Sequence, residues 1–76
     1  MTTNRIAVDP KILSGKPCIK GTRIAVTMVL ELLEDGLSFK DITKDYYPQL
    51  TAEDIRACLE YAKAMIEGEE IHFAAA

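Results

Sequence analysis

The pattern of apolar and polar positions changes character near Val26. Before this point, apolar residues come in short runs broken by glycine and proline, which favours strands and turns. Between Val26 and Gly68 they recur at spacings of three and four, which is typical of helices. With only 76 residues, the chain is short enough for one domain. The sequence predicts a mainly α fold, with an N-terminal β-hairpin arm (1–26), a three-helix core (27–68) and a tail (69–76).

The arm contains signals for two strands, a turn and a hairpin. Residues 5–8 predict a short strand, which Asp9-Pro10 ends, and residues 11–16 predict a helical turn that closes at Gly15. Residues 17–19 and 23–26 are extended pieces on either side of Lys20-Gly21-Thr22. This arrangement predicts a β-hairpin with a three-residue loop.

Three helices follow the arm. The first, over 27–35, has apolar residues on more than one face, which predicts deep burial, and Gly36 is suited to end it. The second and third share a start signal, in which a capping Ser38 or Thr51 is followed three residues later by an aspartate. A leucine before each cap and an isoleucine after it can close a hydrophobic staple.

The ends and faces of the last two helices also follow from local signals. Tyr47-Pro48 stops the second helix at about Tyr46, and Gly68 ends the third. Apolar residues of the third helix at spacings of four, three and four predict one buried stripe: Ile55, Leu59, Ala62 and Ile66.

Two helices joined by a short connection have the geometry of a helix-turn-helix, and with a third helix before them they form the three-helix core that is usual in small DNA-binding domains. Glu53 and Asp54 argue against base recognition by the third helix, because carboxylates on its first turn would repel phosphates. Helix hairpins that bind no nucleic acid are also common.

Charge is distributed unevenly along the chain. Residues 1–30 carry five basic side chains and one acidic one, whereas residues 31–76 carry four basic and eleven acidic ones, within a net charge of −3. The predicted nucleic-acid contacts are Lys16, Lys20, Arg23 and Arg56. The alternatives are a solvated turn, or basic arms that attract acidic bodies in a homodimer. For Arg23 in particular, a structural tie to Glu31 or Glu34 is favoured over a phosphate contact.

Several classes of function find no support in the sequence. Cys18 and Cys58 lie forty positions apart, and His72 is the single histidine, so we expect no metal, no cofactor and no catalytic group. Cys58 is expected to be a small core residue. No apolar run is long enough for a membrane span, and no secretion signal is visible, which predicts a cytoplasmic protein. We also expect no small-molecule substrate. A core this small favours a homodimer.

The tail alternates apolar and polar residues around His72. Ile71 and Phe73 are candidate anchors for a protein partner, in a segment that is either a loose strand or a frayed end.

The chain resembles the domain-of-unknown-function family 433 over roughly residues 6–64. The most specific residues are Gly15-Lys16-Pro17 and Gly21-Thr22-Arg23-Ile24, followed by the pattern Val29-Leu30, Leu33, Gly36-Leu37-Ser38, Ile42, Asp45-Tyr46, Pro48, Leu50-Thr51, Asp54-Ile55 and Ala57. The resemblance implies a homeodomain-like core with an N-terminal hairpin and a dimer. It also implies a role like that of a VapB-type antitoxin encoded beside a nuclease-like toxin with a PIN-like fold.

Two hypotheses follow for the function. The first is a non-enzymatic, antitoxin-like regulator that binds a PIN-like nuclease toxin and, together with it, operator DNA. The alternative is a protein-interaction adaptor that does not bind DNA, which the negative net charge and the acidic third helix favour.

Overall fold

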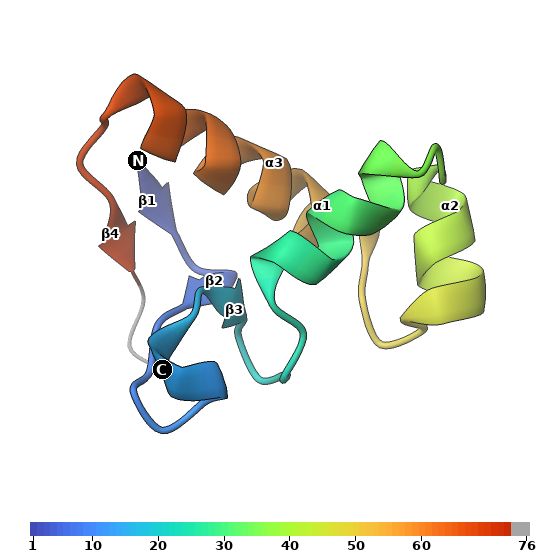
Figure 1. Ribbon diagram of the computed structural model, residues 1–76, viewed down its shortest axis with the longest axis horizontal. Helices are drawn as coiled ribbons and strands as arrows, with labels where there is room; N and C mark the ends of the chain where they lie inside the picture. Colours follow the sequence, from blue (N-terminus) through green and yellow to red (C-terminus); the bar gives the residue numbers. More distant parts are fainter. Residues whose placement is uncertain (74–76) are drawn as a thin grey trace.

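A computed structural model describes residues 1–73 and contains three helical segments and two small two-stranded sheets (Figure 1). The three helices that the sequence predicts are present, together with this small sheet structure. In chain order the elements are β1 (Thr2–Thr3), β2 (Ile6–Ala7), the 3-10 turn η1 (Leu13–Gly15), β3 (Cys18–Ile19), α1 (Val26–Glu34), α2 (Phe39–Asp41), the π-helical turn η2 (Ile42–Tyr46), α3 (Ala52–Glu67) and β4 (His72–Phe73).

The arm is built differently from the predicted hairpin. β3 pairs antiparallel with β2, so that Ile6 lies opposite Ile19. Residues 23–26 form no strand and contact β3 through a single bridge between Cys18 and Ala25. The hairpin is cut short because α1 already begins at Val26, whose N–H donates to the carbonyl of Pro17 over 3.0 Å.

The turn before β3 lies where the sequence predicts it, but its backbone is left-handed. Leu13 and Ser14 have φ values of 52° and 56°, and Gly15 follows with 84°. Left-handed residues with a side chain are strained by roughly 1–2 kcal/mol each. The pairing of β2 with β3 on either side of this turn holds it in place.

The predicted capping signals of the second and third helices are confirmed. Ser38 Oγ accepts the N–H of Asp41 over 3.1 Å, and the Asp41 carboxylate accepts the N–H of Ser38 over 3.0 Å. Thr51 and Asp54 exchange the equivalent bonds at 3.3 and 2.9 Å. α2 continues into η2 as far as Tyr46, the predicted end, and α3 ends at Gly68, which is left-handed with φ 72°.

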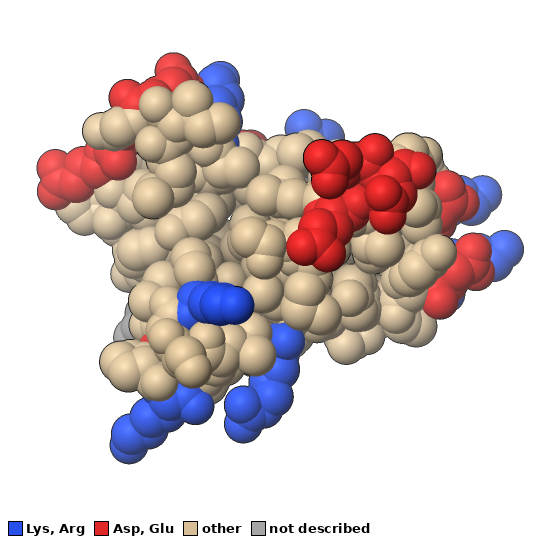
Figure 2. Space-filling model, in the orientation of Figure 1, with Lys and Arg blue, Asp and Glu red and all other residues tan. Residues whose placement is uncertain are grey.

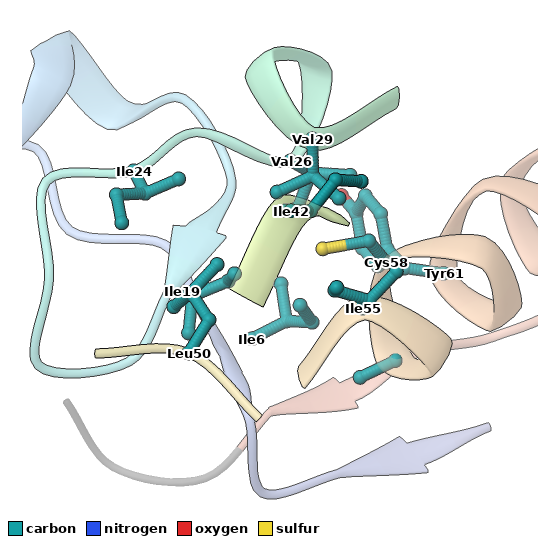
Figure 3. Packing of buried hydrophobic residues seen from close by; sticks show 11 residues of the cluster. Ile6, Ile19, Ile24, Val26, Val29, Ile42, Leu50, Ile55, Cys58 and Tyr61 are labelled. Carbon is teal, nitrogen blue, oxygen red and sulfur yellow. The ribbon is translucent and has the colours of Figure 1, made fainter. Parts of the chain in front are cut away.

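The core joins the arm to the helices (Figure 3). Ile6 and Ile19 from the sheet pack in one cluster with Val29, Ile42 and Ile55 from the helices. Arm and helices therefore share a single apolar interior, and neither part is packed independently of the other.

The face that α3 buries differs from the predicted stripe. Ile55 is buried, but Leu59 is 40% exposed and Ile66 is 87% exposed. The buried residues of α3 are Ile55, Ala57, Cys58, Tyr61 and Ala64. The aromatic ring and small side chains of this set fit against the arm and α1, which rotates the buried face away from the larger aliphatic residues.

The segment after α3 returns to the first strand. β4 pairs parallel with β1, with Thr2 opposite His72 and Thr3 opposite Phe73 (Figure 1). The Met1 ammonium donates to the Glu70 carbonyl, and His72 N–H donates to the Met1 carbonyl, both over 2.7 Å. A loose strand is thus the observed form of the tail up to Phe73, and positions 74–76 lie outside the described residues.

Within residues 1–73, none of the helices combines the length and the apolar character that crossing a membrane requires.

Candidate functional site

Basic side chains gather on the arm. Lys16 and Lys20 flank β3 and Arg23 follows the next turn, and all three are exposed. Figure 2 shows Lys and Arg side chains over the region where Figure 1 places β2, η1 and β3, and acidic side chains over α1 and the far end of α3. Three of the four predicted nucleic-acid contacts therefore lie on one lobe of the molecule.

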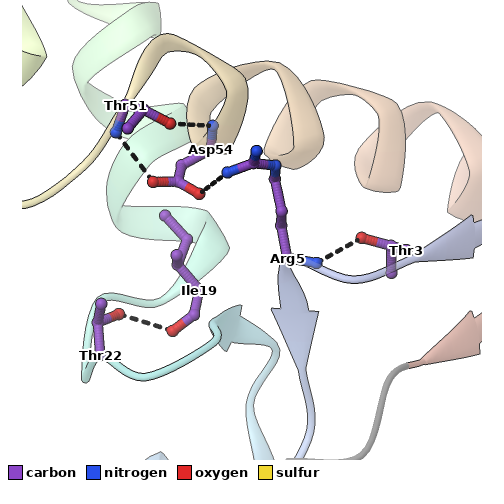
Figure 4. A network of polar contacts seen from close by, with 6 residues as sticks. All are labelled: Thr3, Arg5, Ile19, Thr22, Thr51 and Asp54. Carbon is purple, nitrogen blue, oxygen red and sulfur yellow. Dashed lines mark hydrogen bonds and ion pairs between the residues drawn. The ribbon is translucent and has the colours of Figure 1, made fainter.

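The turn that carries these cations is fixed by its own hydrogen bonds. Thr22 Oγ1 donates to the Ile19 carbonyl over 2.7 Å (Figure 4) and accepts the N–H of Ile24 over 3.0 Å. Gly21 has φ 79°, which a residue without Cβ adopts freely. Lys20 and Arg23 thus project from a defined backbone next to the buried residues Ile19 and Ile24.

Arg56 lies in a different place from the other predicted contacts. It lines a polar cleft of about 200 Å³ between β1 and α3, together with Arg5, Glu53 and Glu60. Two carboxylates share this cleft with the two guanidinium groups. The site is therefore mixed in charge, unlike the arm.

An ion pair that the sequence analysis did not identify joins the arm to α3 (Figure 4). Arg5 Nη1 lies 2.9 Å from Asp54 Oδ1, and the backbone N–H of Arg5 donates to the buried Thr3 over 3.2 Å. Asp54, one of the two acidic residues at the start of α3, is thus neutralised within the chain. Glu53 remains exposed.

Arg23 does not make the expected structural tie. Among residues 1–73 Arg5 forms an ion pair with Asp54 and the His72 ring contacts Glu70, but Arg23 pairs with neither Glu31 nor Glu34. The guanidinium group is exposed and available to an external anion.

An apolar groove of about 330 Å³ lies between α1 and α3. Its lining includes Lys16, Pro17, Val26, Leu30, Tyr61 and Ala62. Sequence reasoning missed this groove because one wall comes from α3, about thirty residues after the other lining residues. On α3, helical spacing alone placed Leu59 and Ile66 in the core, whereas the structure leaves both exposed.

Both cysteines are buried and free, and burial raises the pKa of each thiol. For Cys58 the pKa rises to about 12, mainly through burial and secondarily through the charge of Asp54. The thiol of Cys58 is therefore protonated at neutral pH, and its prediction as a core residue is confirmed.

The two candidate anchors of the tail contact the chain itself. Ile71 packs against the core cluster, and the Phe73 ring lies 5.9 Å from that of Tyr61, centroid to centroid. Phe73 nevertheless stays 40% exposed. Within the part of the chain that the structure describes, no group of three or more His, Cys, Asp or Glu side chains is arranged to hold a metal ion.

The helices, the small sheets and the exposed cations define a small helical protein with a basic N-terminal arm. The chain belongs to the DUF433 family, whose model, described as a protein of unknown function, matches residues 6–62. It is similar to a DUF433 member protein from Anabaena variabilis ATCC 29413 known from a crystal structure, with a TM-score of 0.76 and 32% sequence identity. The match covers 87% of this chain and 64% of that one, so this chain spans a little under two thirds of its neighbour's length. No curated protein matches the chain.

Proposed function

We propose that the protein is a non-enzymatic, cytoplasmic, antitoxin-like regulator that contacts duplex DNA through its arm and binds a PIN-like nuclease. The observation that carries the DNA contact is the cluster of Lys16, Lys20 and Arg23 on a backbone fixed by Thr22. Cations on an ordered backbone can neutralise phosphates and release their counterions at little cost in ordering.

The proposal assigns a homeodomain-like helix-turn-helix to α2, η2 and α3. Its support is the short connection over residues 47–51 and the capping bonds on both sides of it. In this arrangement the arm contacts the phosphates, because Glu53 stands exposed on the first turn of α3 and would repel them. Arg56, with Glu53 and Glu60 beside it, contributes less than the arm.

The nuclease part of the proposal is supported by the family resemblance and by surface chemistry. Leu59, Met65 and Ile66 are large apolar residues that α3 leaves exposed, as is Phe73 on β4. Leu59 and Ile66 lie seven positions apart and therefore on the same side of α3, and exposed apolar side chains that share a face can mark a contact with another protein.

Fluorescence anisotropy with a labelled duplex tests the DNA contact. At about 50 mM salt the protein should bind measurably, and binding should weaken steeply toward about 200 mM salt. Lys20→Ala and Arg23→Ala should each lower affinity about fivefold or more and reduce the salt slope by about one unit.

The matched control is Lys63→Ala, which removes an exposed cation from α3, away from the arm. It should leave the affinity nearly unchanged. Arg23→Ala should also keep the melting temperature of the wild type, because Arg23 makes no ion pair within residues 1–73. Equal losses of DNA affinity for Lys63→Ala and Arg23→Ala would show that the arm does not contact the DNA.

The alternative is a protein-binding adaptor that does not touch DNA. The acidic start of α3 and the net charge of −3 favour it. Undetectable duplex binding at about 50 mM salt, with and without the nuclease, would contradict the regulator and leave the adaptor, since phosphate contacts are strongest at low salt.

A further inference from the structure

We infer that the groove between α1 and α3 binds a small carboxylate with an apolar body, and that this ligand competes with DNA for Lys16. The site rests on the groove alone, whereas the competition rests on the proposed function. The groove of about 330 Å³ falls in the size range of small-molecule sites. The apolar residues of α3 assigned to the nuclease, Leu59, Met65 and Ile66, do not line it.

The groove is lined by a tyrosine whose hydroxyl group the fold leaves without a partner. Tyr61 is only 8% exposed, and among residues 1–73 its hydroxyl makes no hydrogen bond, which is unusual for a buried tyrosine. Within the same residues no completely enclosed side-chain oxygen or nitrogen lacks a partner, so this oxygen reaches open space. Tyr61 lines the groove, and its ring extends from α3 toward Val26 at the start of α1 (Figure 3). Burial raises the pKa of Tyr61, so the hydroxyl is protonated and can donate at neutral pH.

The walls of the groove favour a short apolar ligand body. They are formed by Pro17 of the arm, Val26 and Leu30 of α1, and Ala62 of α3. Val26 and Leu30 stand four positions apart on α1, so about 6 Å of this helix lines the groove. This length fits a ring or a short alkyl chain.

One cation and one hydroxyl define the polar head of the ligand. Of the lining residues within 1–73, Lys16 alone carries a charge. Its ammonium group and the Tyr61 hydroxyl can each donate to one oxygen of a carboxylate. A dianion would leave its second charge unpaired against the apolar walls, where burial of a charge is costly. The groove therefore favours a monoanion.

Lys16 connects this site to the proposed DNA contact. It lines the groove and is also one of the three exposed cations of the arm that are assigned to phosphates. A carboxylate in the groove neutralises it, so the ligand-bound chain makes one phosphate contact fewer. Duplex affinity and its salt dependence then both fall. The ligand thus regulates DNA binding through a side chain that the two sites share.

An NMR titration of the ¹⁵N-labelled protein alone with octanoate tests the site. We expect saturable amide shifts at Val26, Leu30 and Ala62 with a Kd of about 0.1–1 mM, in keeping with the few atoms of the probe. Tyr61→Phe keeps the ring and should weaken binding about threefold or more. Ala62→Leu, which fills the groove, should abolish binding, and Lys20→Ala, outside the lining, should bind octanoate like wild type.

Two results would overturn the site. One is the absence of saturable shifts up to about 10 mM octanoate, and the other is equal octanoate affinity of wild type, Tyr61→Phe and Ala62→Leu. Circular dichroism melts verify that each variant folds. 1-Octanol, which has the same chain without the charge, should bind at least about fivefold more weakly than octanoate.

Fluorescence anisotropy with the labelled duplex at about 50 mM salt tests the competition. Saturating octanoate should lower the duplex affinity of wild type about threefold or more, relative to the same concentration of acetate, and should leave that of Lys16→Ala unchanged. A wild-type duplex affinity that bound octanoate does not alter would overturn the competition. Octanoate binding in the absence of any duplex binding would support the site and contradict the proposed function.

Discussion

Arg5 and Asp54 connect the first strands to the start of the last helix. Arg5 Nη1 contacts Asp54 Oδ1 over 2.9 Å, while Asp54 Oδ2 accepts the backbone N–H of Thr51, also over 2.9 Å. A single carboxylate thus holds the arm and caps α3. The side chain of Asp54 is only 13% exposed, against 46% for that of Arg5.

Asp54→Ala should therefore cost more than Arg5→Ala. We expect a loss of about 1–2 kcal/mol for Asp54→Ala, and of up to about 1 kcal/mol for Arg5→Ala, which removes only a partly exposed ion pair. Urea denaturation gives both values. Asp41→Ala is the matched control, because Asp41 caps through Ser38 without an ion pair, and a larger loss there would contradict this assignment.

Two isoleucines of α3 distinguish the observed buried face from the predicted stripe. Ile55 is fully buried and Ile66 is 87% exposed. Ile55→Ala should cost about 2–5 kcal/mol of unfolding free energy through the cavity it leaves, and Ile66→Ala less than about 0.5 kcal/mol in the monomer. Thermal or urea melts at low micromolar concentration compare the two variants. Similar losses would indicate that both isoleucines lie on one buried face, as the sequence predicts.

The buried thiol of Cys58 makes stability fall at alkaline pH. Its folded-state pKa is raised from 9.0 to about 12, so folding favours the neutral thiol. This contribution is complete below about pH 9 and is lost as the pH rises toward 12, with a slope of up to about 1.4 kcal/mol per pH unit. Urea denaturation at a series of pH values above 8 measures the slope.

Cys58→Ala is the control for this pH dependence. The raised pKa values of Cys18 and Tyr61 act in the same direction and remain in the variant. The slope for Cys58→Ala should therefore be shallower than that of wild type without reaching zero. An unchanged slope would mean that Cys58 ionises freely in the folded chain.

The left-handed turn before β3 should gain from an added glycine. Ser14 has φ 56° and is exposed, so Ser14→Gly relieves backbone strain without removing packing. We expect a gain of up to about 1 kcal/mol, the relief of strain being partly offset by the greater freedom of glycine in the unfolded chain. Ser14→Ala keeps a Cβ and should show no such gain in the same melts.

Local signals in the sequence were sufficient for the helices. The caps at Ser38 and Thr51 act within three residues, so their residue types and spacing determine the hydrogen bonds that the structure contains. Gly68 ends α3 for an equally local reason, because it adopts the left-handed conformation without steric cost.

Features that depend on distant segments were harder to predict. Helical spacing relates Leu59 to Ile55, but only the position of α1 and the arm decides which side of α3 is covered. The same applies to β2, whose partner β3 lies beyond a left-handed turn. It also applies to Arg56, which lies in the cleft with Arg5 and not beside Lys16, Lys20 and Arg23. Exposed cations such as Lys20 could be identified from the sequence, whereas their grouping on one lobe depends on the fold.

The parallel pairing of β1 with β4 sets the order in which this chain can complete its structure during synthesis. Met1 and Glu70 are 69 positions apart, so β1 can receive its partner strand only after α3 has been synthesised. Closing so long a loop for a pair of two-residue strands costs more entropy than the contact returns, unless the core is already formed. β1 is thus synthesised before the helices and fixed in place after them.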